Sequence, residues 1–178
     1  GAEVTLTSDF DTALEADGLL VPGVGAYAAC MAGLRAIRGE RLIGRRLSGG
    51  RPVLGICVGM QVLFGRGIEH GVETEGCDEW PGTVERLQAP VVPHMGWNCV
   101  DRVREHPLLG GIPSDAYFYF VHSYYIDAPE FVAATAHYGV EIHAAMSCEN
   151  VFAVQFHPEK SHTTGLQLLS NFVSWRGD

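Results

Sequence analysis

The sequence predicts an α/β fold, with a mostly parallel open sheet, helices on both of its faces and antiparallel strands added to it. Three observations predict this class. Short apolar runs alternate with helical patterns in the first third of the chain, strand-like runs separated by turns follow from Gly82 onward, and an amphipathic helix closes the chain. A length of 178 residues favours one domain, residues 1–178.

The first third contains three short apolar runs, which predict strands at residues 4–6, 19–21 and 52–56. Helical spacing of apolar residues predicts helices at 27–38, 41–47 and 58–66, and a Gly-Gly pair at 49–50 ends the second of them. This strand–helix order predicts the parallel part of the sheet.

The rest of the chain is dominated by short runs without helices between them. Strands are expected at 91–92, 117–121, 131–136, 142–145 and 151–156. The closing helix is expected at 163–175, with one apolar stripe. That stripe consists of Leu166, Leu169, Phe172 and Val173.

Composition excludes several classes of protein. With 21 acidic and 12 basic residues, the net charge is −9, which disfavours nucleic-acid binding because such binding needs a basic face. No apolar run is long enough to cross a membrane, so a soluble cytoplasmic protein is expected. Five cysteines without a C-x-x-C pair argue against a disulfide framework or zinc site and favour a reducing compartment.

Cys57 lies in the pattern G-I-C-V-G at 55–59, between an apolar strand and a helix. This pattern is typical of a sharp strand-to-helix turn that exposes a nucleophile, with the glycines removing side chains that would collide. At a helix N-terminus the thiolate is expected to be favoured, with the Val58 N–H facing a developing oxyanion. The alternative is a packed core cysteine between ordinary turn glycines.

His157 and Glu159 follow another apolar strand, in the run Q-F-H-P-E. Residues two apart in extended chain point to the same side, and Pro158 biases His157 toward that conformation. The pair therefore predicts a base and its orienting carboxylate, which together with Cys57 would make a triad. A lone histidine is more often structural, and the chain contains eight.

Three motifs resemble class I, triad-type glutamine amidotransferases: G-I-C-V-G-M-Q at 55–61, Q-F-H-P-E-K-S at 155–161, and P-G-V-G at 22–25. The resemblance implies that family's flavodoxin-like fold. Within the family, P-H-M-G-W-N at 93–98 and Y-F-V-H-S-Y at 119–124 resemble glutaminase subunits of imidazole glycerol phosphate synthases. The family's first apolar strand and its D-Y-G-x-G-N turn are absent, so an N-terminal strand and helix are expected to be missing.

The resemblance implies roles for individual residues. Cys57 would be the nucleophile, His157 the acid/base and Glu159 its orienting partner, with backbone N–H groups of Val24 and Val58 forming the oxyanion hole. The residues expected to hold substrate L-glutamine are Gly25, Gln61, Glu69, Ser123 and Tyr124. Those expected at or near a partner interface are Trp97, Tyr119, His122 and Lys160.

The implied reaction is hydrolysis of glutamine to glutamate and ammonia through a Cys57 thioester, with no metal or organic cofactor. The implied partner is a TIM-barrel cyclase subunit, which uses the ammonia to make imidazole glycerol phosphate and an aminoimidazole carboxamide ribotide. Three alternatives stay open: a cysteine peptidase or deglycase with a similar elbow, a glutaminase subunit of another amidotransferase, and a pseudo-glutaminase that only regulates its partner.

Overall fold

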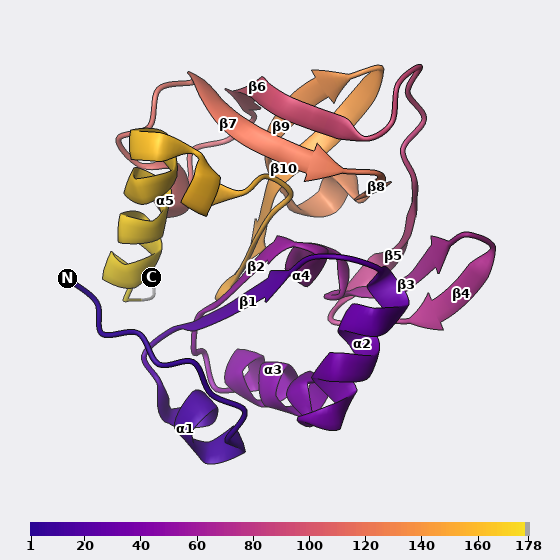
Figure 1. Ribbon diagram of the computed structural model, residues 1–178. Helices are drawn as coiled ribbons and strands as arrows, with labels where there is room; N and C mark the ends of the chain where they lie inside the picture. The colour runs from indigo at the N-terminus through magenta and orange to yellow at the C-terminus, as the bar shows by residue number, and fades with distance from the viewer. Residues whose placement is uncertain (177–178) are drawn as a thin grey trace.

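A computed structural model describes residues 1–176, which form two sheets (Figure 1). The larger sheet has the strand order β1-β2-β11-β10-β9-β6-β7, and the smaller has the order β4-β3-β5-β8. The strands of the larger sheet are β1 (Leu19–Gly23), β2 (Val53–Cys57), β6 (His94–Arg102), β7 (Asp115–His122), β9 (Val132–Tyr138), β10 (Val140–Cys148) and β11 (Val151–Val154). Those of the smaller sheet are β3 (Phe64–Glu69), β4 (Val72–Glu75), β5 (Trp80–Arg86) and β8 (Tyr124–Ile126).

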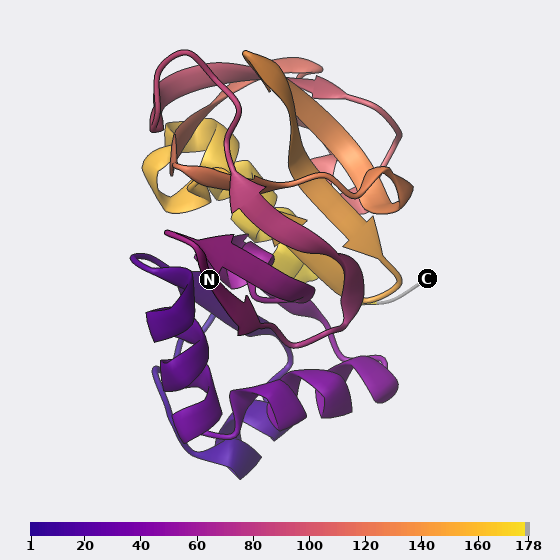
Figure 2. The same ribbon diagram turned by 90° about the vertical axis from the view of Figure 1, so that its right-hand side faces the viewer.

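Helices lie on both sides of the neighbouring strands β1 and β2 (Figure 1). Helices α2 and α3 lie on one side, and α5 lies on the other, between these strands and β7 (Figures 1 and 2). The helices are α1 (Phe10–Glu15), α2 (Tyr27–Ala36), α3 (Gly39–Ser48), α4 (Val58–Gln61) and α5 (His162–Ser174), with 3₁₀ turns at Pro107–Leu109, Pro129–Phe131 and Pro158–Lys160. Within residues 1–176, none of the helices is long and apolar enough to span a membrane.

In the larger sheet, parallel pairing is confined to β1, β2 and β11, and in the smaller sheet β3 pairs with β5 in parallel. The other pairs of the larger sheet are antiparallel. The α/β class is therefore confirmed, but more of the strand pairs in the larger sheet are antiparallel than the sequence predicts. The connections explain this difference: β9 and β10 are separated by Gly139 alone, and β10 and β11 by two residues. Such short links join only antiparallel neighbours, because a parallel neighbour needs a crossover of a dozen residues or more.

Three of the sequence predictions are wrong. Residues 4–6 form no strand, and the side chains of Val4 and Leu6 are exposed because no neighbouring strand pairs with them. The helix predicted at 58–66 ends at Gln61, and β3 begins at Phe64, because this segment pairs with β4 and β5. Residues 91–92 are outside any strand, and β6 starts only after Pro93, which has no N–H for a ladder.

The remaining predicted strands and helices are present, with boundaries shifted by a few residues. The apolar stripe of α5 is partly wrong. Leu168 and Phe172 are buried, and the Phe172 ring lies 5.9 Å from that of Phe152, whereas Leu166 and Val173 are exposed. The helix turns its Leu168–Phe172 face toward the core because residues four apart share one side of a helix.

Arg46 of α3 is completely buried and joins three parts of the chain. Within the described part of the chain, its guanidinium donates hydrogen bonds to backbone carbonyls. Nη1 donates to Ala13, Leu14 and Ala16, and Nη2 donates to Asp17 and Pro52. One planar cation thus supplies hydrogen-bond donors to backbone carbonyls at the end of α1, in the link to β1 and just before β2.

We predict that Arg46→Lys lowers the free energy of unfolding by about 3 kcal/mol, because a lysine ammonium cannot reach five carbonyls and leaves some buried without a donor. Urea-induced unfolding measures the change. Arg41→Lys, on the exposed side of the same helix, is the control and should shift stability by less than about 0.5 kcal/mol. Equal stability of the two variants would contradict this role for Arg46.

Candidate active site

Cys57 occupies a sharp turn between β2 and α4. All five residues of β2 are buried, and helix α4 starts at the residue after Cys57. The backbone of Cys57 has φ 56° and ψ −115°, a conformation that is strained for a residue with a side chain. The structure therefore contains the strand–turn–helix geometry that the G-I-C-V-G pattern predicts.

The glycines of this pattern allow backbone to lie against backbone. A Cβ on Gly59 would overlap the carbonyl oxygen of Val21 in β1, and a Cβ on Gly55 would lie 2.5 Å from the Gly59 carbonyl oxygen. Gly23, at the end of β1, is restricted in the same way, because its Cβ would lie 2.5 Å from the Gly59 nitrogen. Any side chain at these positions would push α4 away from β1 and move Cys57.

His157 and Glu159 follow the end of β11, which lies beside β2. The Nδ1 of His157 lies 2.6 Å from Oε1 of Glu159, so this nitrogen carries the ring proton and donates a hydrogen bond to the carboxylate. The His157 side chain is almost fully buried, and its Nε2 has no hydrogen-bond partner among residues 1–176. An unpaired Nε2 with a lone pair is the group that a base would present to a thiol.

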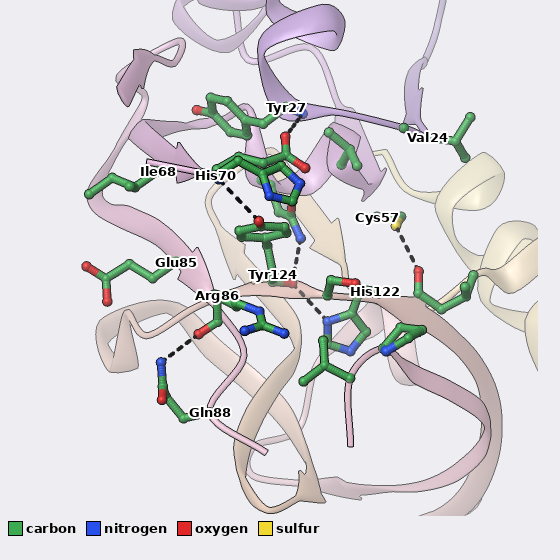
Figure 3. A pocket seen from close by; sticks show the side chains of 18 of the residues that line it. Val24, Tyr27, Cys57, Ile68, His70, Glu85, Arg86, Gln88, His122 and Tyr124 are labelled. Atoms are coloured by element: carbon green, nitrogen blue, oxygen red, sulfur yellow. Dashed lines mark hydrogen bonds between the residues drawn. The ribbon is translucent and has the colours of Figure 1, made fainter. Parts of the chain in front are cut away.

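One pocket brings the predicted residues together. Its lining includes Cys57 and His157, and Figure 3 shows Cys57 and Val24 on one side of it, across from His122 and Tyr124. The strands β1, β2 and β11 run parallel, so Val24, Cys57 and His157 all follow the carboxyl ends of neighbouring strands. That edge of a parallel sheet is where ligands usually bind. The wall of the pocket also includes Val58, predicted for the oxyanion hole, and the predicted substrate residues Gly25, Gln61, Glu69, Ser123 and Tyr124.

The expectation of a stabilised Cys57 thiolate is wrong for this state of the site. Burial raises the pKa of the Cys57 thiol to about 11, and the hydrogen bond from the Val58 N–H offsets only part of that rise. Helix α4 has only four residues, so few aligned peptide dipoles act on the sulfur. Cys57 is consequently a neutral thiol here, and attack requires that its proton be removed.

Glu69 is the last residue of strand β3. Its Oε2 accepts a hydrogen bond of 2.6 Å from the backbone N–H of Tyr27, the first residue of α2. A negative charge is favourable at that end of a helix. The contact holds the carboxylate in the pocket wall.

Gln155 is a residue whose contacts the sequence analysis missed, although it begins the Q-F-H-P-E run. Its side chain is buried, its Oε1 accepts from Gln61 at 2.9 Å, and its Nε2 lies 3.8 Å from the Cys57 sulfur. The presence of Gln155 in the same motif as His157 was the one indication in the sequence that it belongs to the site. No spacing rule predicts that a glutamine two residues before His157 reaches Cys57.

The four residues expected at an interface divide into two groups. The first group is a partly exposed cluster of Trp97, Tyr119 and Lys160. The ring centroids of Trp97 and Tyr119 are 5.9 Å apart, and the Lys160 Nζ lies 5.8 Å from the centroid of the Tyr119 ring. Trp97 also stacks on His162 at 5.1 Å. His122, in contrast, is buried at the end of β7 and lines the pocket.

Comparisons with known proteins identify the family of this chain. The family described as "Glutamine amidotransferase class-I" matches residues 2–175. Among solved structures, a crystal structure of a glutamine amidotransferase superposes with a TM-score of 0.73 and 17% identity, covering 97% of this chain and 87% of the other. The glutaminase domain of Trypanosoma brucei CTPS superposes with a TM-score of 0.63 and 17% identity, covering 95% of this chain and 75% of the other.

Curated relatives are much more similar in sequence. The imidazole glycerol phosphate synthase subunit HisH of Thermobifida fusca (strain YX) is 58% identical over 98% of this chain and 87% of its own length. The HisH subunit of Nocardia farcinica (strain IFM 10152) is 59% identical over 97% of this chain and 86% of its own length. The chain therefore belongs to the class I glutamine amidotransferase family, within which its sequence is similar to imidazole glycerol phosphate synthase subunits HisH.

Proposed function

We propose that this chain hydrolyses L-glutamine to glutamate and ammonia, as the glutaminase subunit of an imidazole glycerol phosphate synthase. The observation that carries the proposal is the arrangement of Cys57 and His157 in one pocket. Cys57 stands on a strained turn, and His157 keeps Nε2 unpaired while Glu159 occupies its Nδ1. The family match and the HisH relatives support the same activity.

The first half of the reaction makes a thioester. Nε2 of His157 takes the proton of the Cys57 thiol while the sulfur attacks the carboxamide carbon of glutamine. The carbonyl oxygen becomes an oxyanion that accepts hydrogen bonds from the N–H groups of Val24 and Val58. His157 then gives its proton to the amide nitrogen, the C–N bond breaks, and ammonia leaves.

The second half regenerates the thiol. His157 removes a proton from a water molecule, which attacks the thioester carbon. The carbon–sulfur bond breaks, and the sulfur takes the proton back from His157 as glutamate leaves. Glu159 stays ionised throughout and stabilises the imidazolium that forms in each half.

The substrate's α-amino and α-carboxylate groups need opposite partners. The Glu69 carboxylate is suited to the ammonium, and the Gln61 amide lies in the same wall. Backbone groups of Gly25, Ser123 and Tyr124 are the proposed partners of the carboxylate. We propose the whole of residues 1–178 as one glutaminase domain.

Ammonia is protonated in neutral water and then no longer acts as a nucleophile, so direct transfer to a second site is favourable. The proposed recipient is a TIM-barrel cyclase subunit, in a heterodimer whose interface includes the exposed Trp97, Tyr119 and Lys160 cluster. The proposed compartment is the cytoplasm, where reducing conditions keep the five thiols free.

The test is a synthase assay with a purified cyclase. With glutamine as the nitrogen source, the mixture of the two subunits should form both products, and neither subunit alone should do so. Glutamate formation without product in the mixture would contradict the assignment of this partner, while leaving the glutaminase reaction in place.

We predict that Cys57→Ala abolishes glutamine-dependent synthesis, because no other group in the pocket can form the thioester. Synthesis from added ammonia by the complex should remain at the wild-type rate, which shows that the variant folds and binds its partner. Glutaminase activity that survives the substitution would contradict the role of Cys57.

We predict selective alkylation of Cys57 by a glutamine-like electrophile, because binding brings the reagent to the sulfur beside His157. Iodoacetamide at pH 8 should instead label the half-buried Cys148 before Cys57. The thiolate fraction of Cys57 is small below its pKa of about 11 and grows as pH rises, so its iodoacetamide labelling should grow with pH. Peptide mapping with the electrophile that found another cysteine labelled first would count against the site.

We predict that Glu159→Gln is about two orders of magnitude less damaging to kcat than His157→Ala. Glu159 acts through His157, and half of its side chain is exposed, so water replaces part of its effect. Steady-state glutaminase assays of both variants in the complex measure the difference. Equal loss in the two variants would show that the carboxylate acts directly on the substrate.

A further inference from the structure

The chain passes from one sheet to the other beside the active site. His122 ends β7 in the larger sheet, and Tyr124 begins β8 in the smaller one, with only Ser123 between them. All three residues line the pocket. Whatever holds this crossover therefore fixes one wall of the site.

A pair of buried histidines lies at this crossover. His94 is the cross-strand partner of His122, and Nδ1 of His94 lies 2.9 Å from Nε2 of His122. The His94 ring is stacked between Phe120 and Tyr138, with centroids 4.6 Å and 4.1 Å away. The rings have little freedom to turn, so their hydrogen bonds are directional.

The hydrogen bonds assign every proton of this pair. The Tyr124 carbonyl only accepts, so Nδ1 of His122, 2.9 Å away, carries a proton. The Asn98 amide nitrogen donates to Nε2 of His94 at 3.1 Å, so Nδ1 of His94 carries the proton of that ring. Nδ1 of His94 then donates to Nε2 of His122, which accepts. Each ring thus has one proton and one lone pair, both used, and both rings are neutral. Burial lowers the pKa of each histidine to about 4, in agreement.

The same carbonyl connects the histidines to Gln61. Nε2 of Gln61 donates to the Tyr124 carbonyl at 2.9 Å and to Oε1 of Gln155 at 2.9 Å. Both N–H groups of the Gln61 amide are occupied, so only its oxygen is left for a ligand. An acceptor in the wall that also contains Glu69 suits the ammonium group of an amino acid.

We propose that His94 and His122 are a neutral positioning pair, which holds the Tyr124 carbonyl against the Gln61 amide so that Gln61 turns its oxygen toward the substrate ammonium. The inference rests on the proposed glutamine hydrolysis. The pair is not catalytic, because its four ring nitrogens are all used within the protein. Its loss should weaken substrate binding and leave the chemistry at Cys57 in place.

The test compares two substitutions of His122 in the complex with the cyclase. The amide nitrogen of asparagine lies close to the place of the histidine Nδ1, whereas leucine has a similar shape and no donor. His122→Leu should raise KM for glutamine about tenfold with kcat within about twofold of wild type. His122→Asn should restore KM to within about twofold of wild type. His137→Leu, which changes an exposed ring on β9, is the control and should leave both constants unchanged.

The outcomes separate this inference from the proposed function. Absence of glutaminase activity in the wild-type complex would overturn the proposed function. Wild-type activity with an unchanged KM in His122→Leu, or with equal defects in the Leu and Asn variants, would overturn the positioning role alone. A fall in kcat at unchanged KM would also overturn it.

A spectroscopic readout tests the proton assignment on the unmodified chain, without reference to activity. In ¹⁵N-labelled protein, His94 and His122 should both show a proton on Nδ1 and stay neutral at pH 6. Signals of an imidazolium, or of a proton on Nε2, in either histidine would contradict the pair as described.

Discussion

The direct backbone contact between Gly59 of α4 and Val21 of β1 is the constraint on which the rest of the site depends. It leaves no room for a side chain, so β2 must end abruptly and Cys57 must adopt a positive φ. The sulfur then stands at the carboxyl edge of three parallel strands. The Val24 segment follows the first of these strands, and His157 follows the third.

Burial is the second constraint, and it acts against the helix dipole. Cys57 and His157 are both almost completely enclosed, so a thiolate would lack solvation. In the proposed mechanism, the neutral thiol is therefore the resting form, and proton transfer to His157 accompanies attack. Such a site couples nucleophile formation to the arrival of a substrate, which protects the sulfur from other electrophiles.

Much of this was predictable from the sequence where a motif has a local geometric meaning. The G-I-C-V-G run specifies an elbow because small residues are required there, and the His157–Glu159 contact follows from a two-residue spacing around Pro158. The α/β class follows from the alternation of apolar runs and helical patterns. The parallel strands β1, β2 and β11 confirm the parallel part of the predicted sheet.

The rest depends on contacts between distant residues. Helix α4 stops at Gln61 because the following residues pair with β5, which begins more than fifteen residues later. The burial of His122 follows from its cross-strand partner His94 and could not be read from the Y-F-V-H-S-Y run. The raised pKa of Cys57 follows from the packing of the complete site, whereas the sequence showed only the helix N-terminus.

The central claim is that Cys57, held at the elbow beside His157, forms a covalent intermediate with glutamine. Rapid acid quenching of the complex during its first turnover, followed by mass spectrometry of proteolytic peptides, tests this most directly. The account predicts a γ-glutamyl adduct on the peptide that contains Cys57. An adduct on a different cysteine, or glutamate formed in that turnover with no adduct at Cys57, would contradict it.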